Sequence, residues 1–141
     1  MLGKIFKKQK EVSSDNQNVL VAALLIHAAK IDENYTDMEK KIIKKALLDL
    51  YNITSDQAEE LIKQAEKKEE ESNQMLEFTR EIKKYPMEFR LKIIEIIWKI
   101  VYSDGTSDSY ESNLIRRICG LLYISDKDNG IIKTKVQNLP K

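Results

Sequence analysis

The sequence has few of the residues that interrupt regular secondary structure, with four glycines and two prolines among 141 residues. A β-sandwich needs turn residues at roughly every 8–12 positions, so this scarcity argues against one and favours helices. Cysteine is rarer still. The single cysteine, Cys119, cannot form an intramolecular disulfide, which suits a reducing compartment and leads us to expect a cytoplasmic protein.

Long apolar runs and an excess of one charge are also missing. The longest apolar run, Val19 to Ile26, falls far short of the roughly 18 residues of a membrane-spanning helix. The 24 basic and 23 acidic residues give a net charge of +1, so nothing points to a nucleic acid as partner. Hydrophobic residues at 42% and charged residues at 33% are typical of one globular domain with charged helix surfaces.

The first ten residues carry four lysines around three apolar side chains. Residues 11–17 are polar, where a secretory leader would have an apolar segment and a cleavage site. We therefore expect residues 1–15 to form a flexible tail. Any contact of residues 1–10 with an anionic membrane surface should be weak and peripheral, because one short basic turn binds membranes poorly.

Helix start signals recur along the chain. Capping boxes, in which a Ser or Thr is followed three residues later by Glu or Gln, begin at Ser14, Thr36 and Thr54. The related pairs Asp108–Glu111 and Ser125–Asp128 predict two further helix starts. Apolar side chains after these signals recur at intervals of three and four, which is the period of a buried helix face. A fourth helix over about residues 73–85 should end at Pro86, which can also open a fifth.

These signals predict an all-α fold, a compact bundle of six or seven short helices over residues 16–135, with residues 136–141 as a loose tail. The helix after Ser14 is apolar almost all round and should lie at the centre of the core. The charged stretch Glu66–Glu71 should be solvated, and Gly120 should let another helix approach closely. The side chains expected to point inward are Ile42, Ile43, Ala46, Leu47, Leu50, Ala58, Leu61, Ile62, Ala65, Leu76, Phe78 or Thr79, Ile82, Leu91, Ile94, Ile97, Trp98, Val101, Leu114, Ile115, Ile118, Leu121 and Leu122.

The second half of the chain repeats the pattern of the first at an offset of 72 residues, which places Asp32–Glu39 on Asp104–Glu111. Each copy contains an apolar helix, an acidic loop, a capped helix, a turn with a tyrosine and a second cap. Such a helical pair used twice can pack about a pseudo-two-fold axis around one core. We therefore expect an internal pseudo-two-fold repeat.

The acidic loop of the second copy is a candidate cation site. Asp104, Asp108 and Glu111 could supply three carboxylates, and Thr106 or Ser107 a further oxygen, which are the ligands that Ca²⁺ or Mg²⁺ prefers. The loop is not an EF-hand, because the required glycine and glutamate positions hold other residues. The structural alternative is that carboxylates at a helix N-terminus simply stabilise it through the cap and the dipole.

Several segments together resemble the tellurite-resistance protein B (TerB) family, most closely its short stand-alone bacterial members. They are Ala28–Asp32, Phe78–Ile82, the spacing Arg90-Leu91-x-x-Ile94-x-x-x-Trp98, and Ser103–Arg117. The likeness covers about residues 19–128 and implies an all-helical bundle with internal pseudo-symmetry. It also implies acidic clusters at paired helix starts and a metal-linked role, and members occur fused to other modules such as a co-chaperone J-domain.

Carried over to this sequence, the second acidic cluster falls on Asp104, Asp108 and Glu111, and the first, more weakly, on Asp32 and Glu39. The first copy departs from the family pattern. Glu33 replaces the usual glycine and Thr36 replaces the usual aspartate.

We expect a non-enzymatic interaction or adaptor domain with an unidentified protein partner, linked by the resemblance to stress response or tellurite resistance. The alternative is a divalent-cation-binding or sensing protein that uses the loop Asp104–Glu111, with Ca²⁺ or Mg²⁺ as its cofactor. A metal-dependent hydrolase is a third hypothesis, with less support from the sequence. His27, the only histidine, and Cys119 both lie in apolar helices and read as core or boundary residues. No phosphate-binding loop, zinc spacing or serine nucleophile motif is present.

Overall fold

The computed structural model describes residues 17–30, 35–72, 75–104 and 109–139. Within these ranges the chain is almost entirely helical and contains no strand, which confirms the all-α prediction. The first helix covers residues 17–29. The others are α2 (Asp37–Tyr51), α3 (Ser55–Ser72), α4 (Met75–Ile82), α5 (Met87–Val101), the short 3₁₀ helix η2 (Tyr102–Asp104), α6 (Ser109–Leu121) and α7 (Asp126–Gln137). None of the helices in these ranges is long and apolar enough to cross a membrane.

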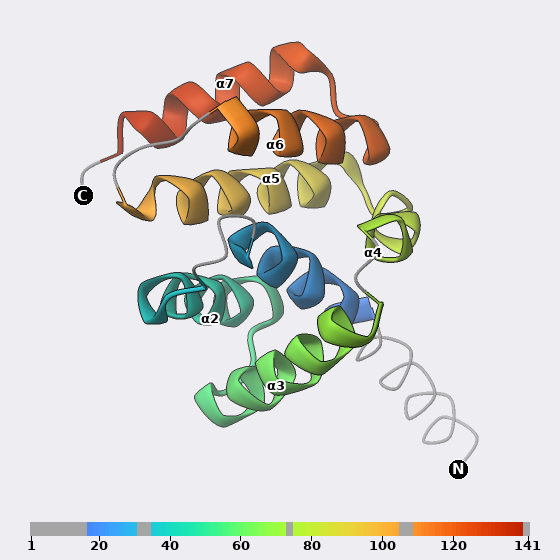
Figure 1. The fold of residues 1–141 in the computed structure, drawn as a ribbon, viewed down its shortest axis with the longest axis vertical. Helices are drawn as coiled ribbons and strands as arrows, with labels where there is room; N and C mark the ends of the chain where they lie inside the picture. The colour runs from blue at the N-terminus through green and yellow to red at the C-terminus, as the bar shows by residue number, and fades with distance from the viewer. Residues whose placement is uncertain (1–16, 31–34, 73–74, 105–108, 140–141) are drawn as a thin grey trace.

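The helices form two groups that meet at α5 (Figure 1). In one group α5 packs against α6 and α7, and in the other α2 packs against α3. The first helix lies between the groups, and α4 lies at the side, where it contacts α6. Because α5 also packs against α2, it joins both groups into one core.

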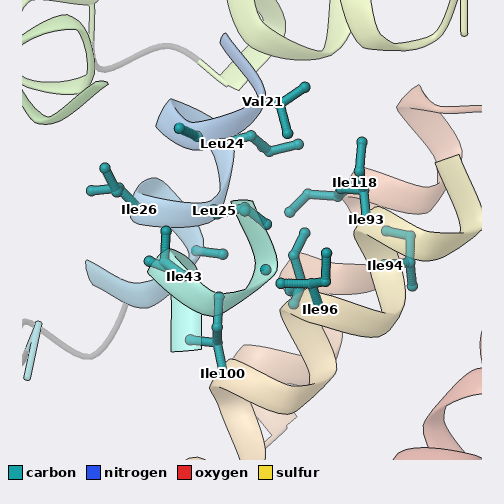
Figure 2. Packing of buried hydrophobic residues seen from close by; sticks show 14 of the residues in the cluster. Val21, Leu24, Leu25, Ile26, Ile43, Ile93, Ile94, Ile96, Ile100 and Ile118 are labelled. Atoms are coloured by element: carbon teal, nitrogen blue, oxygen red, sulfur yellow. The ribbon is translucent and has the colours of Figure 1, made fainter. Parts of the chain in front are cut away.

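The first helix is the centre of that core, as its apolar sequence predicts. The side chains from Val21 to Ile26 are all fully buried, and His27 is the one half-buried position before Ala28 and Ala29. Figure 2 shows its leucines and isoleucine in one cluster with Ile43 of α2, Ile93 of α5 and Ile118 of α6. A helix buried on every side can only form when neighbours from both groups cover it.

Trp98 ties α5 to α7. Its side chain is 1% exposed, and its indole Nε1 donates a hydrogen bond of 2.9 Å to Oδ1 of Asn129. Its ring stacks on Tyr102 with the centroids 5.7 Å apart, and the Lys133 Nζ lies 5.2 Å from the ring centroid. The predicted burial of Ile94 and Trp98 is thereby confirmed, whereas Leu114 is only half-buried.

Three caps form as the sequence predicts. The Thr36 hydroxyl accepts from the Glu39 amide at 3.1 Å, and the Glu39 carboxylate accepts from the Thr36 amide at 2.8 Å. Thr54 and Gln57 make the same reciprocal pair at 3.1 and 2.9 Å. The Ser125 hydroxyl accepts from the Asp128 amide at 3.1 Å. The other two start signals depend on Ser14 and Asp108, which lie outside the described residues.

Both helical hairpins turn in a similar way. Asn52 after α2 and Tyr123 after α6 adopt the left-handed conformation, with φ of 51° and 60°, and a capped helix follows each. Positive φ allows the chain to reverse tightly after the last helical turn. The likeness of these two turns agrees with the expected repeat, while the two-fold relation of the complete halves stays a prediction.

Some expected details are wrong. Phe78, Thr79 and Ile82 of α4 are buried as predicted, but Leu76 is exposed, and Met75 takes its place because it lies on the same helical face as Phe78, Thr79 and Ile82.

Gly120 faces open space, so no helix packs closely on it. The last helix also differs from expectation, since α7 continues to Gln137 and buries Val136, beyond the boundary placed at residue 135.

Candidate functional site

The predicted cation ligands fall mostly outside what the structure describes. Asp32 and Asp108 lie outside the described residues, and so do the side chains of Asp104 and Glu111. The acidic-loop site therefore stays a prediction. Among the described side chains, no group of three or more His, Cys, Asp or Glu residues is placed to hold a metal ion.

Glu39 is the one predicted ligand whose side chain is described. It is buried, and its Oε1 accepts hydrogen bonds from the amide of Thr36 at 2.8 Å and from the Thr36 hydroxyl at 3.1 Å. These bonds close the capping box at the start of α2. They give the Glu39 carboxylate a structural role in holding the helix terminus.

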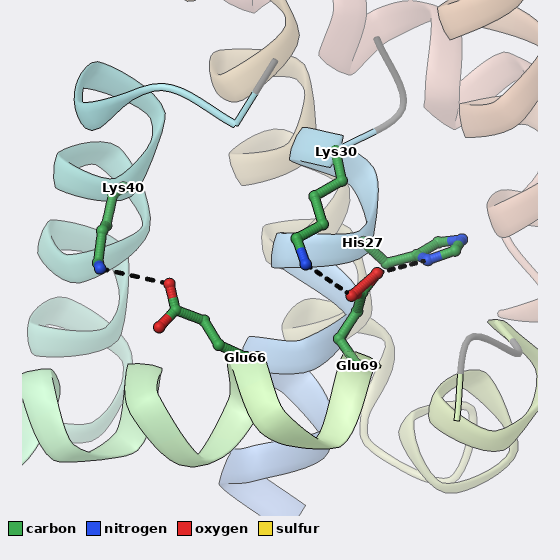
Figure 3. Close-up of polar contacts among 5 residues, drawn as sticks. All are labelled: His27, Lys30, Lys40, Glu66 and Glu69. Atoms are coloured by element: carbon green, nitrogen blue, oxygen red, sulfur yellow. Dashed lines mark hydrogen bonds and ion pairs between the residues drawn. The ribbon is translucent and has the colours of Figure 1, made fainter. Parts of the chain in front are cut away.

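Glu69 of α3 forms a buried polar cluster with the first helix (Figure 3). It is 5% exposed, and its Oε2 accepts a hydrogen bond of 3.1 Å from the Nζ of Lys30. Its Oε1 lies 3.6 Å from the Nδ1 of His27. Burying a carboxylate is unfavourable unless it is paired, and Lys30 provides the pair.

This burial corrects the expectation that the whole stretch Glu66–Glu71 is solvated. Glu69 continues the buried stripe of Ala58, Ile62 and Ala65, at successive spacings of four, three and four. The helical period therefore places Glu69 on the buried face, but the many charged residues around it led to the prediction that it is solvated. His27 lies next to Glu69 because α3 packs over this part of the first helix.

Further ion pairs connect α2 to α3. The Lys40 Nζ lies 3.3 Å from Glu66, and the Lys44 Nζ lies 3.0 Å from Glu59. The hydrogen bond and charge of Lys44 lower the pKa of Glu59. Burial first, and then the Glu66 carboxylate, raise the pKa of Tyr35. These contacts fasten the hairpin of α2 and α3 and do not converge on an open site.

Cys119 is a core residue, as predicted. Its side chain is fully buried, and burial raises the pKa of its thiol to about 12. Near neutral pH the thiol is therefore protonated, and a protonated buried thiol is a poor nucleophile.

A hollow in the described surface runs between α2, α5 and α7. Its larger half has a volume of about 810 Å³ and is lined by apolar side chains that include Ile42, Leu50, Ile96, Val136 and Leu139.

A smaller half of about 740 Å³ shares Asp49, Leu50, Lys92 and Glu95 with the first and continues towards Pro86. We call the two halves together the α2–α5–α7 groove. The sequence does not predict this groove, because its walls come from three segments far apart in the chain.

A family model for the tellurite resistance protein TerB matches residues 18–134. The chain belongs to the TerB family. The match extends from the first helix into α7, so the TerB domain contains almost all of the groove. No curated protein and no solved structure matches the chain.

Large apolar side chains remain exposed along the groove of this TerB domain. Met38 and Ile131 are each 58% exposed and Leu139 is 40% exposed, and all three line it. They are half of the six large hydrophobic residues that are exposed in the described part of the chain. Three of the exposed apolar side chains therefore line one hollow.

The charged side chains that line the groove are four lysines and four carboxylates, namely Lys45, Lys92, Lys99, Lys135, Asp49, Glu88, Glu95 and Asp128. Glu95 lies between Lys99, at 3.8 Å, and Lys135 of α7, at 2.5 Å. Burial acts to raise the pKa of Glu95, but Lys135, Lys99 and Lys92 together outweigh it and lower the pKa below its usual value. Lys45, Asp49 and Lys92 also line the groove and are exposed, and none of them forms an ion pair within 4 Å among the described residues.

Proposed function

We propose that this TerB domain is a non-enzymatic interaction domain that binds a protein partner in the α2–α5–α7 groove. The observation that carries the proposal is the exposure of Met38, Ile131 and Leu139 along a continuous hollow. When a partner covers exposed apolar side chains, removing their surface from water contributes favourable free energy to binding. The remaining lining is suited to recognition, because it combines aliphatic with charged side chains.

Membership of the TerB family supports a link between this interaction and tellurite resistance or stress response. In that case the partner belongs to the same resistance or stress system. The domain then acts as an adaptor, and its effect in the cell depends on which protein it binds.

The test compares a groove variant with a matched variant elsewhere. Met38→Ser combined with Ile131→Ser removes two exposed apolar side chains from the groove, whereas Leu76→Ser removes one from α4, outside it. Tagged full-length chains are expressed in the source cells, and co-purified proteins are quantified by mass spectrometry. A partner retained by wild type and Leu76→Ser should fall by about tenfold with the groove variant, because interface anchors dominate binding.

The three substituted side chains are exposed, so each variant should keep its melting temperature within a few degrees. If the groove variant folds normally and keeps every partner that Leu76→Ser keeps, the groove is not the binding surface and the proposal is wrong.

A further inference from the structure

The sulfur atoms of the chain differ in how they can react with an oxidant. The sequence has one cysteine and four methionines, and both residue types are targets of peroxide oxidation. Cys119 is fully buried, and burial raises the pKa of its thiol to about 12, so the reactive thiolate is scarce near neutral pH. A thioether needs no deprotonation before it reacts, so solvent exposure decides which methionine an oxidant reaches.

The three described methionines differ in exposure and in place. Met75 of α4 is buried at 7%, whereas Met38 of α2 is 58% exposed and Met87 of α5 is 40% exposed. Met38 lines the larger half of the α2–α5–α7 groove, and Met87 lines neither half. The fourth methionine, Met1, lies outside the described residues. Among the described methionines, Met38 is therefore the one that is both exposed and part of the groove.

Met38 is the most exposed member of an apolar stripe on α2. Ile42, Ala46 and Leu50 follow it at successive spacings of four, and all four side chains line the larger half of the groove. Ala46 is buried, and Ile42 and Leu50 are half-buried. Met38 therefore offers a bound partner more apolar surface than any other side chain of this stripe.

We propose that Met38 is a modification site at which hydroperoxides oxidise the thioether to a sulfoxide, and that this oxidation weakens partner binding in the groove. A lone pair on Sδ attacks one oxygen of the hydroperoxide, and the S–O bond forms as the O–O bond breaks. The proton of the attacked oxygen passes to the leaving oxygen, which departs as water or an alcohol. Sulfur loses two electrons and the hydroperoxide gains them.

The sulfoxide changes what Met38 offers to a partner. Its oxygen is a polar acceptor on a side chain that was apolar, and oxidation of this kind disrupts interfaces that contain methionine. Covering that oxygen with an apolar surface is unfavourable unless a donor meets it. The inference rests on the proposed function, because it requires that the groove binds a protein.

Peptide mass spectrometry measures which methionine is oxidised. The full-length chain is treated with hydrogen peroxide, quenched with free methionine and digested with trypsin. Met38, Met75 and Met87 then fall in separate peptides, of residues 31–40, 69–80 and 85–90. In the folded chain the sulfoxide should form at least about tenfold faster at Met38 than at Met75, because Met75 becomes accessible only when the fold opens locally. In concentrated urea the two rates should become equal.

Binding is then compared between oxidised chains. Immobilised wild type, Met38→Leu and Met87→Leu are oxidised and quenched in the same way and incubated with extract of the source cells. The partner that the groove variant loses should be retained about fivefold to tenfold less after oxidation of wild type or Met87→Leu. Met38→Leu keeps an apolar side chain without sulfur, so oxidation should not change its retention. Methionine sulfoxide reductase should restore binding to oxidised wild type.

Oxidised wild type should keep its melting temperature within a few degrees, because Met38 is exposed. Equal oxidation rates at Met38 and Met75 in the folded chain would overturn the inference, and so would an equal loss of the partner by oxidised wild type and oxidised Met38→Leu. If the groove variant loses its partner but oxidised wild type keeps it, the interaction function stands and the role of Met38 is wrong. If no retained protein depends on the groove residues, both proposals are wrong.

Discussion

Trp98 combines an apolar, a polar and a cationic contact at one buried side chain. The indole is enclosed by the core, its nitrogen is hydrogen bonded to Asn129, and its ring contacts Tyr102 and Lys133. A buried tryptophan normally finds a partner for its N–H, because an unpaired donor in the core is unfavourable. Most of its contribution should nevertheless come from the buried ring, since area outweighs one hydrogen bond.

Trp98→Ala should therefore lower the free energy of unfolding by about 3–5 kcal/mol, as for other large core deletions. Asn129→Ala removes only the hydrogen-bond acceptor and should lower it by about 1–3 kcal/mol, because the indole donor is left unpaired. Urea denaturation followed by circular dichroism measures both changes. A loss below about 1 kcal/mol for Trp98→Ala would show that the ring contributes little to the core.

The buried Glu69 gives a second prediction for single residues. Lys30→Met should be more destabilising than Glu69→Gln, because it leaves a buried carboxylate without its main partner. Since the Lys30 side chain is partly exposed, we expect a loss of about 1–3 kcal/mol for Lys30→Met, smaller than for a fully buried pair.

The double variant Lys30→Met with Glu69→Gln should recover part of that loss, because it removes the unpaired charge. Denaturation in urea gives the comparison. If the double variant is as unstable as the sum of the two single changes, Lys30 does not compensate the charge of Glu69.

At the scale of the elements, α7 is attached to α5 and η2 by polar contacts in addition to the packing of Val136 and the half-buried Ile132. Val136 is its one buried residue, while Asn129 bonds to Trp98, Lys135 pairs with Glu95, and Gln137 donates to the hydroxyl of Tyr102 at 2.7 Å. The sequence predicts the start of this helix through Ser125, because a cap is a local signal. It underestimates its length, because the contacts that extend it come from α5.

The pairing of Glu95 predicts a pH dependence. Its folded pKa is lowered below the usual value near 4.5, so the pair stabilises the fold above that pH and loses its effect as the pH falls through the folded pKa. Acidification from about pH 6 to pH 3 should therefore lower the melting temperature of wild type more than that of Glu95→Gln.

Glu70→Gln serves as the control for this comparison. It removes a carboxylate that is exposed and has no ion pair in the described part of α3. In thermal scans between pH 3 and 6, the melting temperature of Glu70→Gln should fall on acidification by as much as that of wild type. If the melting temperatures of Glu95→Gln and wild type fall equally on acidification, the α5–α7 ion pair does not stabilise the fold.

At the scale of the whole molecule, helix starts and core stripes could be predicted because they depend on residues close in sequence. The caps at Thr36, Thr54 and Ser125 and the buried first helix are examples. The α2–α5–α7 groove could not be predicted, because it exists only once three distant helices pack together. Glu69 lies between these cases, since its position on the buried face of α3 follows from the sequence spacing but its pairing with Lys30 does not.

The acidic loop gives a prediction for the whole domain, because a cation bound only by the folded chain stabilises all of it. If Asp104, Asp108 and Glu111 bind Ca²⁺ or Mg²⁺, millimolar concentrations of that ion should raise the melting temperature. Asp104→Asn should abolish the rise while barely changing the metal-free protein, since it removes a like charge.

If Asp108 is only a helix cap, Asp108→Ala should cost about 0.5–2 kcal/mol with or without the ion, and Asp104→Asn should have no effect. Titration calorimetry decides between these outcomes. No heat and no melting shift with either ion would rule out a cation site in this loop.

The polar attachment of α7 also sets the order in which the fold opens. A helix with one buried side chain can detach at a lower free energy than the first helix, which cannot leave without breaking the core. Amide hydrogens of α7 should therefore exchange with deuterium well before those of Val21–Ile26. Since α7 is one wall of the groove, each such opening momentarily widens it, so the groove could admit a ligand at a rate set by local unfolding.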